Sequence, residues 1–193
     1  MPRTSQGGLG SRLRQAASDV RGAIAVEFAL VVPVLLLLVV GTAEVVRYVK
    51  AYMVFSVAVN SMAQVVAAQS SVTAGTSGTM GDFCKGARLT MGAYSTSTLA
   101  VSVASATNPT SGGATVVDWE TDTSCATTGT AIGYSSALTT LTPYIPNDGD
   151  SAILVKAQFT YVPLLTQIVT SSITLTQQTI VRPRKGSVTC SGC

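Results

Sequence analysis

Residues 24–43 read IAVEFALVVPVLLLLVVGTA, and Glu27 is the one charged residue in this stretch. At about 1.5 Å per residue, about 20 helical residues cross a hydrocarbon layer of about 30 Å. Because lipid offers the backbone no hydrogen-bond partner outside a helix, Pro33 is expected to kink the helix without ending it. The stretch therefore predicts a transmembrane helix over residues 24–43.

The positive charge of the chain lies ahead of this stretch. The 193 residues carry a formal net charge of +3. Residues 1–22 hold four arginines and one aspartate, whereas residues 23–193 hold eight basic and eight acidic side chains. A basic flank stays in the cytoplasm, so we expect a cytoplasmic leader over 1–22 and export of residues 44–193 to the periplasm. The sequence predicts a single-pass protein of the inner (cytoplasmic) membrane, and its neutral remainder offers no basic surface for nucleic acid.

A cleaved secretory signal, cut after the small residue Ala43, is the alternative interpretation of this segment. However, the apolar run is longer than the usual signal core of about 7–15 residues. No glycine or proline interrupts residues 44–69, where apolar side chains recur at spacings of three and four: Val45, Tyr48, Tyr52, Phe55, Val59, Met62 and Val66. We therefore expect one helix over 23–69, with a transmembrane part (24–43) and an amphipathic part (44–69). The apolar stripe of the second part packs either on the protein's own exported domain or on a partner.

The junction between leader and span resembles a known cleavage motif. Residues 21–28 read RGAIAVEF, so a basic leader ends in Gly22, the small residue Ala23 follows, and a glutamate lies five positions after the glycine. This arrangement resembles that of type IV prepilins. The longer apolar run resembles the TadE-like family, the minor pilins or pseudopilins of the tight-adherence (Tad, Flp) pilus system. The segment AILVKAQFTYVPLL at 152–165 and the strand before the basic, proline-containing end are also similar to this family.

The resemblance implies a function in pilus assembly. A membrane-anchored minor pilin of this family takes part in assembling Tad/Flp-type IV pili for surface adherence, and it can itself enter the extracellular pilus. The implied partners are the inner membrane, the prepilin peptidase, other pilin subunits and the Tad assembly platform. The family also implies cleavage between Gly22 and Ala23. Glu27 would then meet the new amine of a neighbouring subunit and set the axial register; alternatively, it is a charge near the interface that extends towards the headgroups.

Ser, Thr, Val and Ala dominate the exported region and favour strands with one face in water. A Gly/Ser/Thr linker over 70–81 is expected to end the long helix. Four segments have the pattern of strands: 99–106, 115–120, 153–161 and 173–181. Two turns and a short helix are expected at 108–113, 146–150 and 134–141. The predicted fold class is α+β, a long transmembrane and amphipathic helix followed by a small antiparallel β-sheet domain over 82–185 in a pilin-like layout, with a Cys-containing tail over 186–193.

All four cysteines lie in the exported region: Cys84, Cys125, Cys190 and Cys193. An even number of cysteines in an exported region indicates disulfides. We expect Cys84 to pair with Cys125, which closes a loop of about forty residues worth roughly 4 kcal/mol, and Cys190 to pair with Cys193. A redox-active Cys-x-x-Cys motif is the alternative, but it needs a helix N-terminus to activate the thiol. Here the motif ends the chain in a Ser/Gly tail.

The chain contains no histidine, which excludes a Ser-His-Asp or Cys-His catalytic unit and a His-ligated zinc site. Three carboxylates at 118–122 are expected to form a solvated strand edge. The sequence NDGD at 147–150 lacks the distal glutamate of a calcium loop and is expected to be a turn. Arg182, Arg184 and Lys185 are expected to form a solvated tail. The sequence therefore predicts no enzyme and no cofactor or metal site, and the alternative to a pilin is an uncleaved bitopic envelope protein whose periplasmic β-domain acts in binding or scaffolding.

Overall fold

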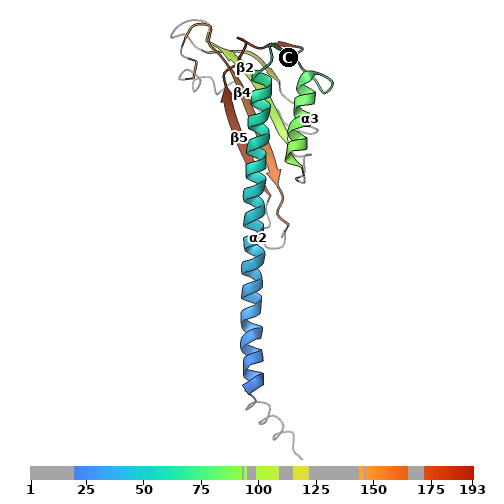
Figure 1. The fold of residues 1–193 in the computed structure, drawn as a ribbon, viewed down its shortest axis with the longest axis vertical. Coiled ribbons are helices and arrows are strands. Elements are labelled where there is room, and N and C mark those ends of the chain that lie inside the picture. Colours follow the sequence, from blue (N-terminus) through green and yellow to red (C-terminus); the bar gives the residue numbers. More distant parts are fainter. Residues whose placement is uncertain are drawn as a thin grey trace, which may run out of the picture. The chain divides into compact units, whose positions relative to one another are not determined.

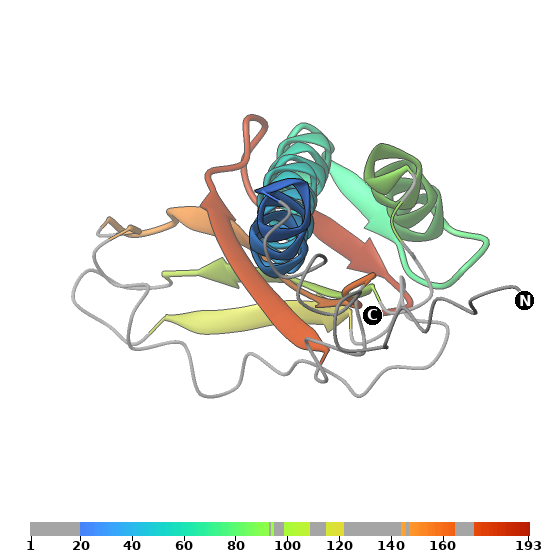
Figure 2. The same ribbon diagram turned by 90° about the horizontal axis from the view of Figure 1, so that it is seen from below.

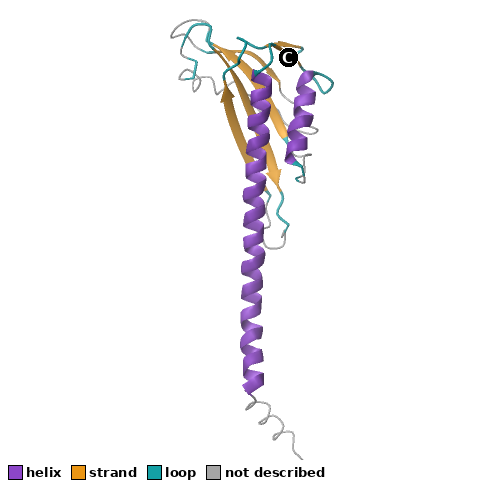
Figure 3. Cartoon of the chain, in the orientation of Figure 1, coloured by secondary structure: helices purple, strands orange, loops and turns teal. Residues whose placement is uncertain are grey.

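Two helices and six strands follow one another in the described part of the chain (Figure 1, Figure 3). The chain divides into two units, residues 1–46 and residues 47–193. The helix predicted over 134–141 lies outside the described residues. The computed structural model describes residues 20–92, 94, 99–108, 115–121, 144–145, 147–164 and 172–193.

Helix α2 extends from Val20 to Ala67 and contains 48 residues. It passes through Pro33 without ending. At its C-terminal end the amide of Gln69 donates a hydrogen bond to the carbonyl of Val66 at 3.0 Å. This i→i+3 bond tightens the last turn and satisfies one of the carbonyls that a helix end leaves unpaired. The described part of the helix thus begins three residues before the predicted start, and the helix ends two residues earlier than the sequence predicts.

Four strands form one antiparallel sheet in the order β3-β2-β4-β5. Each strand overlaps a segment that the sequence predicts, with ends that differ by at most two residues. The bounds are Ala100–Thr107 for β2, Val116–Thr121 for β3, Ser151–Tyr161 for β4 and Ile173–Val181 for β5. The α+β fold class, a long N-terminal helix followed by a small antiparallel sheet, is therefore confirmed.

The part of α2 in the second unit packs on this sheet (Figure 2). The ring centroids of Phe55 and Phe159 are 5.9 Å apart, and those of Tyr48 and Tyr161 are 5.6 Å apart in a T-shaped arrangement. The buried side chains of this part of the helix are Ala51, Phe55, Ala58, Val59, Met62, Ala63, Val66 and Ala67. The amphipathic part of the helix therefore packs on the protein's own domain from Tyr48 to Ala67.

Two of the seven positions of the predicted apolar stripe do not pack on the protein's own domain. Val45 is 62% exposed and Tyr52 is 44% exposed, whereas the alanine at 51 is fully buried. Alanines let the helix backbone approach the sheet closely, so small side chains occupy part of the contact that the sequence pattern assigns to large ones. Hydrophobic periodicity identifies the phase of the buried face, but it does not show how far along the helix the covering domain extends.

The segment predicted as a linker over 70–81 contains strand β1 (Ser71–Thr73) and the start of helix α3 (Thr79–Met91). The two elements are joined by reciprocal bonds, because the amide of Thr73 donates to the hydroxyl of Thr79 at 2.8 Å and the amide of Thr79 donates to the hydroxyl of Thr73 at 2.9 Å. Gly81 permits the tight connection, since a Cβ there would collide with the carbonyl of Thr76. The linker is therefore an ordered turn between two elements.

The C-terminal residues return to the body of the second unit, in contrast to the predicted solvated tail. Strand β6 (Thr189–Ser191) pairs in parallel with β1, and Val188 is 1% exposed. The indole Nε1–H of Trp119 donates to the carbonyl of Val188 at 2.6 Å. Before this strand, the amide of Arg184 donates to the carbonyl of Ala67 at 2.9 Å. These pairings join residues far apart in sequence, which local composition does not encode.

Replacing Trp119 with phenylalanine is expected to loosen the C-terminal segment. The change removes the donor to the carbonyl of Val188 and leaves a buried acceptor unsatisfied, at a cost of about 1–3 kcal/mol. Hydrogen exchange read by mass spectrometry should show faster exchange over residues 188–191. Tyr144→Phe, at an exposed side chain, is the matched control and should leave the exchange rates unchanged. Unchanged exchange in Trp119→Phe would show that the indole does not hold the segment.

Candidate membrane and assembly segment

The residues predicted for processing and register lie close together at the N-terminal end of α2. Gly22 and Ala23 fall in the first turn of the helix, and Glu27 lies one turn further on. All three are exposed. Among the described residues, no hydrogen bond or ion pair involves the Glu27 carboxylate. Its immediate neighbours Val26 and Phe28 are also exposed, so a single carboxylate projects from an apolar helix surface.

Gly22 lowers the local stability of the helix. Glycine in a helix interior is about 1 kcal/mol less favourable than alanine. A protease that binds its substrate in extended form therefore meets less resistance at the peptide bond after Gly22.

The N-terminal part of α2 is long and apolar enough to cross a membrane, and the protein does not cover it. The candidate span falls in the helix Gly22–Ala67; its 18-residue window has a mean hydropathy of 2.9, and none of the window is buried. A core helix of a soluble protein would be covered by its own chain. By length and composition the window can cross a membrane, as the span of a transmembrane anchor or of an N-terminal signal sequence does.

The cysteines occupy two separate places in the second unit. Cys190 and Cys193 form a disulfide with their Cα atoms 5.8 Å apart. Cys84 lies on α3, is 2% exposed and is disulfide-bonded. Cys125, its predicted partner, lies outside the described residues, so that pairing stays a prediction.

The carboxylates of the edge strand β3 are engaged by hydroxyls of the neighbouring strand β2. Asp118 accepts hydrogen bonds from Ser105 at 3.2 Å and Thr107 at 2.5 Å, and Glu120 accepts one from Ser102 at 3.0 Å. Within the described residues, no group of three or more His, Cys, Asp or Glu side chains is placed to hold a metal ion. Asp122 lies outside the described residues. The arrangement stabilises the pairing of β2 with β3. Strand β3 is at the edge of the sheet, as the sequence predicts, but Asp118 and Glu120 are hydrogen-bonded to β2 and are not merely solvated.

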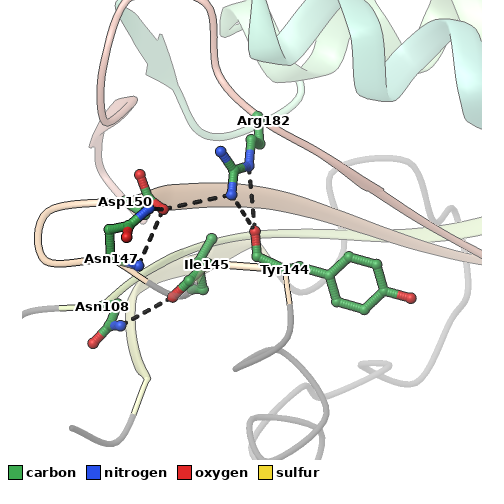
Figure 4. Close-up of polar contacts among 6 residues, drawn as sticks. All are labelled: Asn108, Tyr144, Ile145, Asn147, Asp150 and Arg182. Atoms are coloured by element: carbon green, nitrogen blue, oxygen red, sulfur yellow. Dashed lines mark hydrogen bonds and ion pairs between the residues drawn. The ribbon is translucent and has the colours of Figure 1, made fainter. Parts of the chain in front are cut away.

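The sequence NDGD at 147–150 forms the predicted turn directly before β4 (Figure 4). The carboxylate of Asp150 accepts hydrogen bonds from the amide and the side chain of Asn147 at 3.2 and 3.0 Å. Gly149 has φ of +76°, in the region that favours glycine. The Asp150 carboxylate thus serves the turn, as expected for a turn and not for a calcium loop.

Arg182 ties this turn to the end of β5. Its guanidinium donates to the carbonyl of Tyr144 at 2.8 Å and lies 3.5 Å from the carboxylate of Asp150 (Figure 4). The side-chain amide of Asn108 donates to the carbonyl of Ile145 at 2.9 Å in the same region. The arginine predicted to be part of a solvated tail therefore has a structural contact.

These observations define the class of protein: a long, exposed, apolar N-terminal helix that continues into a small α+β domain. A family model described as TadE-like protein matches residues 22–64. The match lies entirely within α2 and includes Gly22, Ala23 and Glu27. It confirms the resemblance to the TadE-like family over this segment. No curated protein and no solved structure matches the chain.

Proposed function

We propose that this chain is a membrane-anchored minor pilin or pseudopilin that takes part in assembling Tad-type pili for surface adherence. The observation that carries the proposal is that the TadE-like match at 22–64 falls on a helix with an 18-residue apolar window, none of which is buried. Such a helix holds the subunit in the membrane before assembly and packs against other pilin helices afterwards. The protein acts by assembly, and we assign it no catalytic residue.

The proposed topology has the leader in the cytoplasm and the sheet domain in the periplasm. The excess of arginine in residues 1–22 supports this orientation. The Cys190–Cys193 disulfide supports it independently, because structural disulfides persist in oxidising compartments such as the periplasm. The subunit resides in the inner membrane, from which the Tad assembly platform extracts it into the extracellular pilus.

Processing and register are the two tasks of the N-terminal end of α2. A prepilin peptidase cuts after Gly22 and leaves Ala23 with a free, positively charged amine. Glu27 lies four positions later, on the same side of the helix as that amine. In apolar surroundings the attraction between ammonium and carboxylate is strong, and it fixes the axial position of otherwise uniform apolar helices.

The mature N-terminus tests the processing step. Sequencing of the protein purified from membranes and from sheared pili is expected to begin at Ala23. A mature protein that begins at Met1 would contradict cleavage and favour the uncleaved bitopic envelope protein. A mature protein that begins at Glu44 would instead favour the interpretation of this segment as a cleaved secretory signal.

A matched pair of glycine variants gives this test its control. Gly22→Ile places a branched side chain at the cleavage position and should leave the leader attached. Gly41→Ala lies in the same helix, where an added Cβ meets no atom within 4 Å, and should be processed normally. Normal processing of Gly22→Ile would refute the assignment of the cleavage position.

A further inference from the structure

We propose that the end of the second unit nearest Arg47 docks on the headgroup layer of the membrane that holds α2. The inference rests on the membrane anchoring in the proposed function. It adds a second, non-spanning contact with lipid, made by the end of β4 and the last turn of α3. This contact would hold the sheet domain against the membrane before assembly.

The end of β4 carries exposed apolar side chains. Val162 and Leu164, directly after the strand, are 57% and 68% exposed. Ile173 begins β5, pairs with Tyr161 and is also exposed. These side chains gather at one end of the sheet, where neighbouring β-strands would otherwise end in polar turns.

The last turn of α3 lies at the same end of the unit. Helix α3 and strand β4 run in the same direction beside α2 (Figure 1). Three residues after α3, the hydroxyl of Tyr94 donates to the carbonyl of Arg47 at 3.4 Å. In the last turn itself Leu89 is 81% exposed, and it lines an open depression together with Lys85 and Arg88.

The chain length between the predicted span and Tyr48 limits how far Tyr48 can lie from the bilayer. Tyr48 lies five residues after Ala43, which is about 7.5 Å of helix and at most about 18 Å of extended chain. Tyr48 contacts Tyr161 directly, with their ring centroids 5.6 Å apart. The headgroup region on each side of the hydrocarbon is about 5–8 Å thick. Measured along the chain, Tyr48 therefore lies within about 18 Å of the end of the predicted span.

The side chains at this end match the chemistry of a membrane interface. Tyrosine is enriched at the interface because its ring is apolar and its hydroxyl is polar. The basic residues here are Arg47, Lys50, Lys85 and Arg88, and basic side chains are attracted by anionic headgroups. Asp82 is paired with Lys85 at 3.0 Å. The opposite end of β4 instead carries the acidic turn at 147–150.

A lipid surface fits these features better than a protein partner does. The exposed apolar side chains come from two separate elements, α3 and the end of β4, and both of these contact α2 one turn past the predicted span. A surface that meets both at once must extend around the helix, as the membrane does. The apolar side chains of an interfacial segment enter the boundary between headgroups and acyl chains.

Tryptophan fluorescence in vesicles tests the contact. The full chain is reconstituted in vesicles of phosphatidylcholine and phosphatidylglycerol whose acyl chains are brominated close to the headgroup. Leu164→Trp and Leu89→Trp report on the proposed contact, and both replace exposed side chains. Tyr144→Trp, at the other end of the sheet, is the matched control. Leu36→Trp reports on insertion of α2, and the native Trp119 provides the background.

The expected result is quenching of Leu164→Trp and Leu89→Trp that exceeds that of Tyr144→Trp several-fold. If both are quenched no more than Tyr144→Trp while Leu36→Trp is quenched, the inference fails and the anchoring stands. Such a result would assign the apolar end to a protein partner. If Leu36→Trp also escapes quenching, the anchoring and the inference fail together.

Discussion

Replacing Glu27 with alanine is expected to abolish pilus assembly while the protein still inserts into the membrane. The carboxylate lies on an exposed apolar helix and contacts no described residue, so the fold of the subunit does not require it. In the proposed assembly the Glu27 carboxylate pairs with the Ala23 amine of a neighbouring subunit. Loss of one partner of a buried ion pair costs about 3–5 kcal/mol. At about 1.4 kcal/mol per factor of ten, assembly is disfavoured by more than about a hundredfold.

Membrane fractionation and sheared-pilus yield separate the two effects of this variant. Removal of a charge from an apolar span favours insertion, so Glu27→Ala should remain in the membrane at the wild-type level or above it. Glu27→Gln keeps the size and the hydrogen-bonding oxygen but not the charge, and it should fail in assembly as well. Glu44→Ala, a carboxylate beyond the predicted span, is the control and should assemble normally. Wild-type piliation in Glu27→Ala would refute the register role.

The sheet was predictable because its strands carry a local pattern. Apolar side chains fall on one face of each strand because of the alternation in 99–106 and the β-branched residues in 153–161 and 173–181. This pattern can be recognised in each segment without knowing which strand it pairs with. The long helix was predictable for the same reason, since no glycine or proline interrupts 44–69. Both elements follow from short-range periodicity.

Helix α3 shows what the same reasoning misses. Its sequence TMGDFCKGARLTM contains two glycines, which lower helix propensity. A second signal was nevertheless present, because the buried residues Met80, Cys84, Ala87 and Met91 recur at spacings of four, three and four. This apolar face predicts a helix only if glycine is allowed at positions inside the helix. At Gly81 the structure shows why glycine is needed.

The pairing of segments that are distant in the chain could not be predicted from the sequence. Strands β1 and β6 are three residues each and are far apart in the chain. The Trp119 bond to Val188 joins positions 69 residues apart. Nothing in the local composition of a Ser/Gly-rich end distinguishes a paired strand from a solvated tail. The candidate processing site differs in this respect, since Gly22, Ala23 and Glu27 form a local motif that the sequence alone reveals.

Replacing Phe55 with alanine is expected to destabilise the second unit strongly. Phe55 is fully buried and packs on Phe159 of β4, with ring centroids 5.9 Å apart. Truncation of a buried phenylalanine costs about 3–5 kcal/mol, because transfer energy is lost and a cavity is left. The side chain lies where α2 contacts the sheet, so this loss weakens the attachment of the helix to the domain that it carries.

Val57→Ala provides the matched control for this measurement. Val57 lies two residues away on the same helix, is 59% exposed, and should change stability by less than about 0.5 kcal/mol. The full chain in detergent micelles is unfolded with urea, and Trp119, which packs against the same core, reports the transition. A Phe55→Ala variant as stable as Val57→Ala would mean that α2 does not dock on the sheet in solution. The stripe on α2 would then be available to a partner, which is the alternative that the periodicity alone left open.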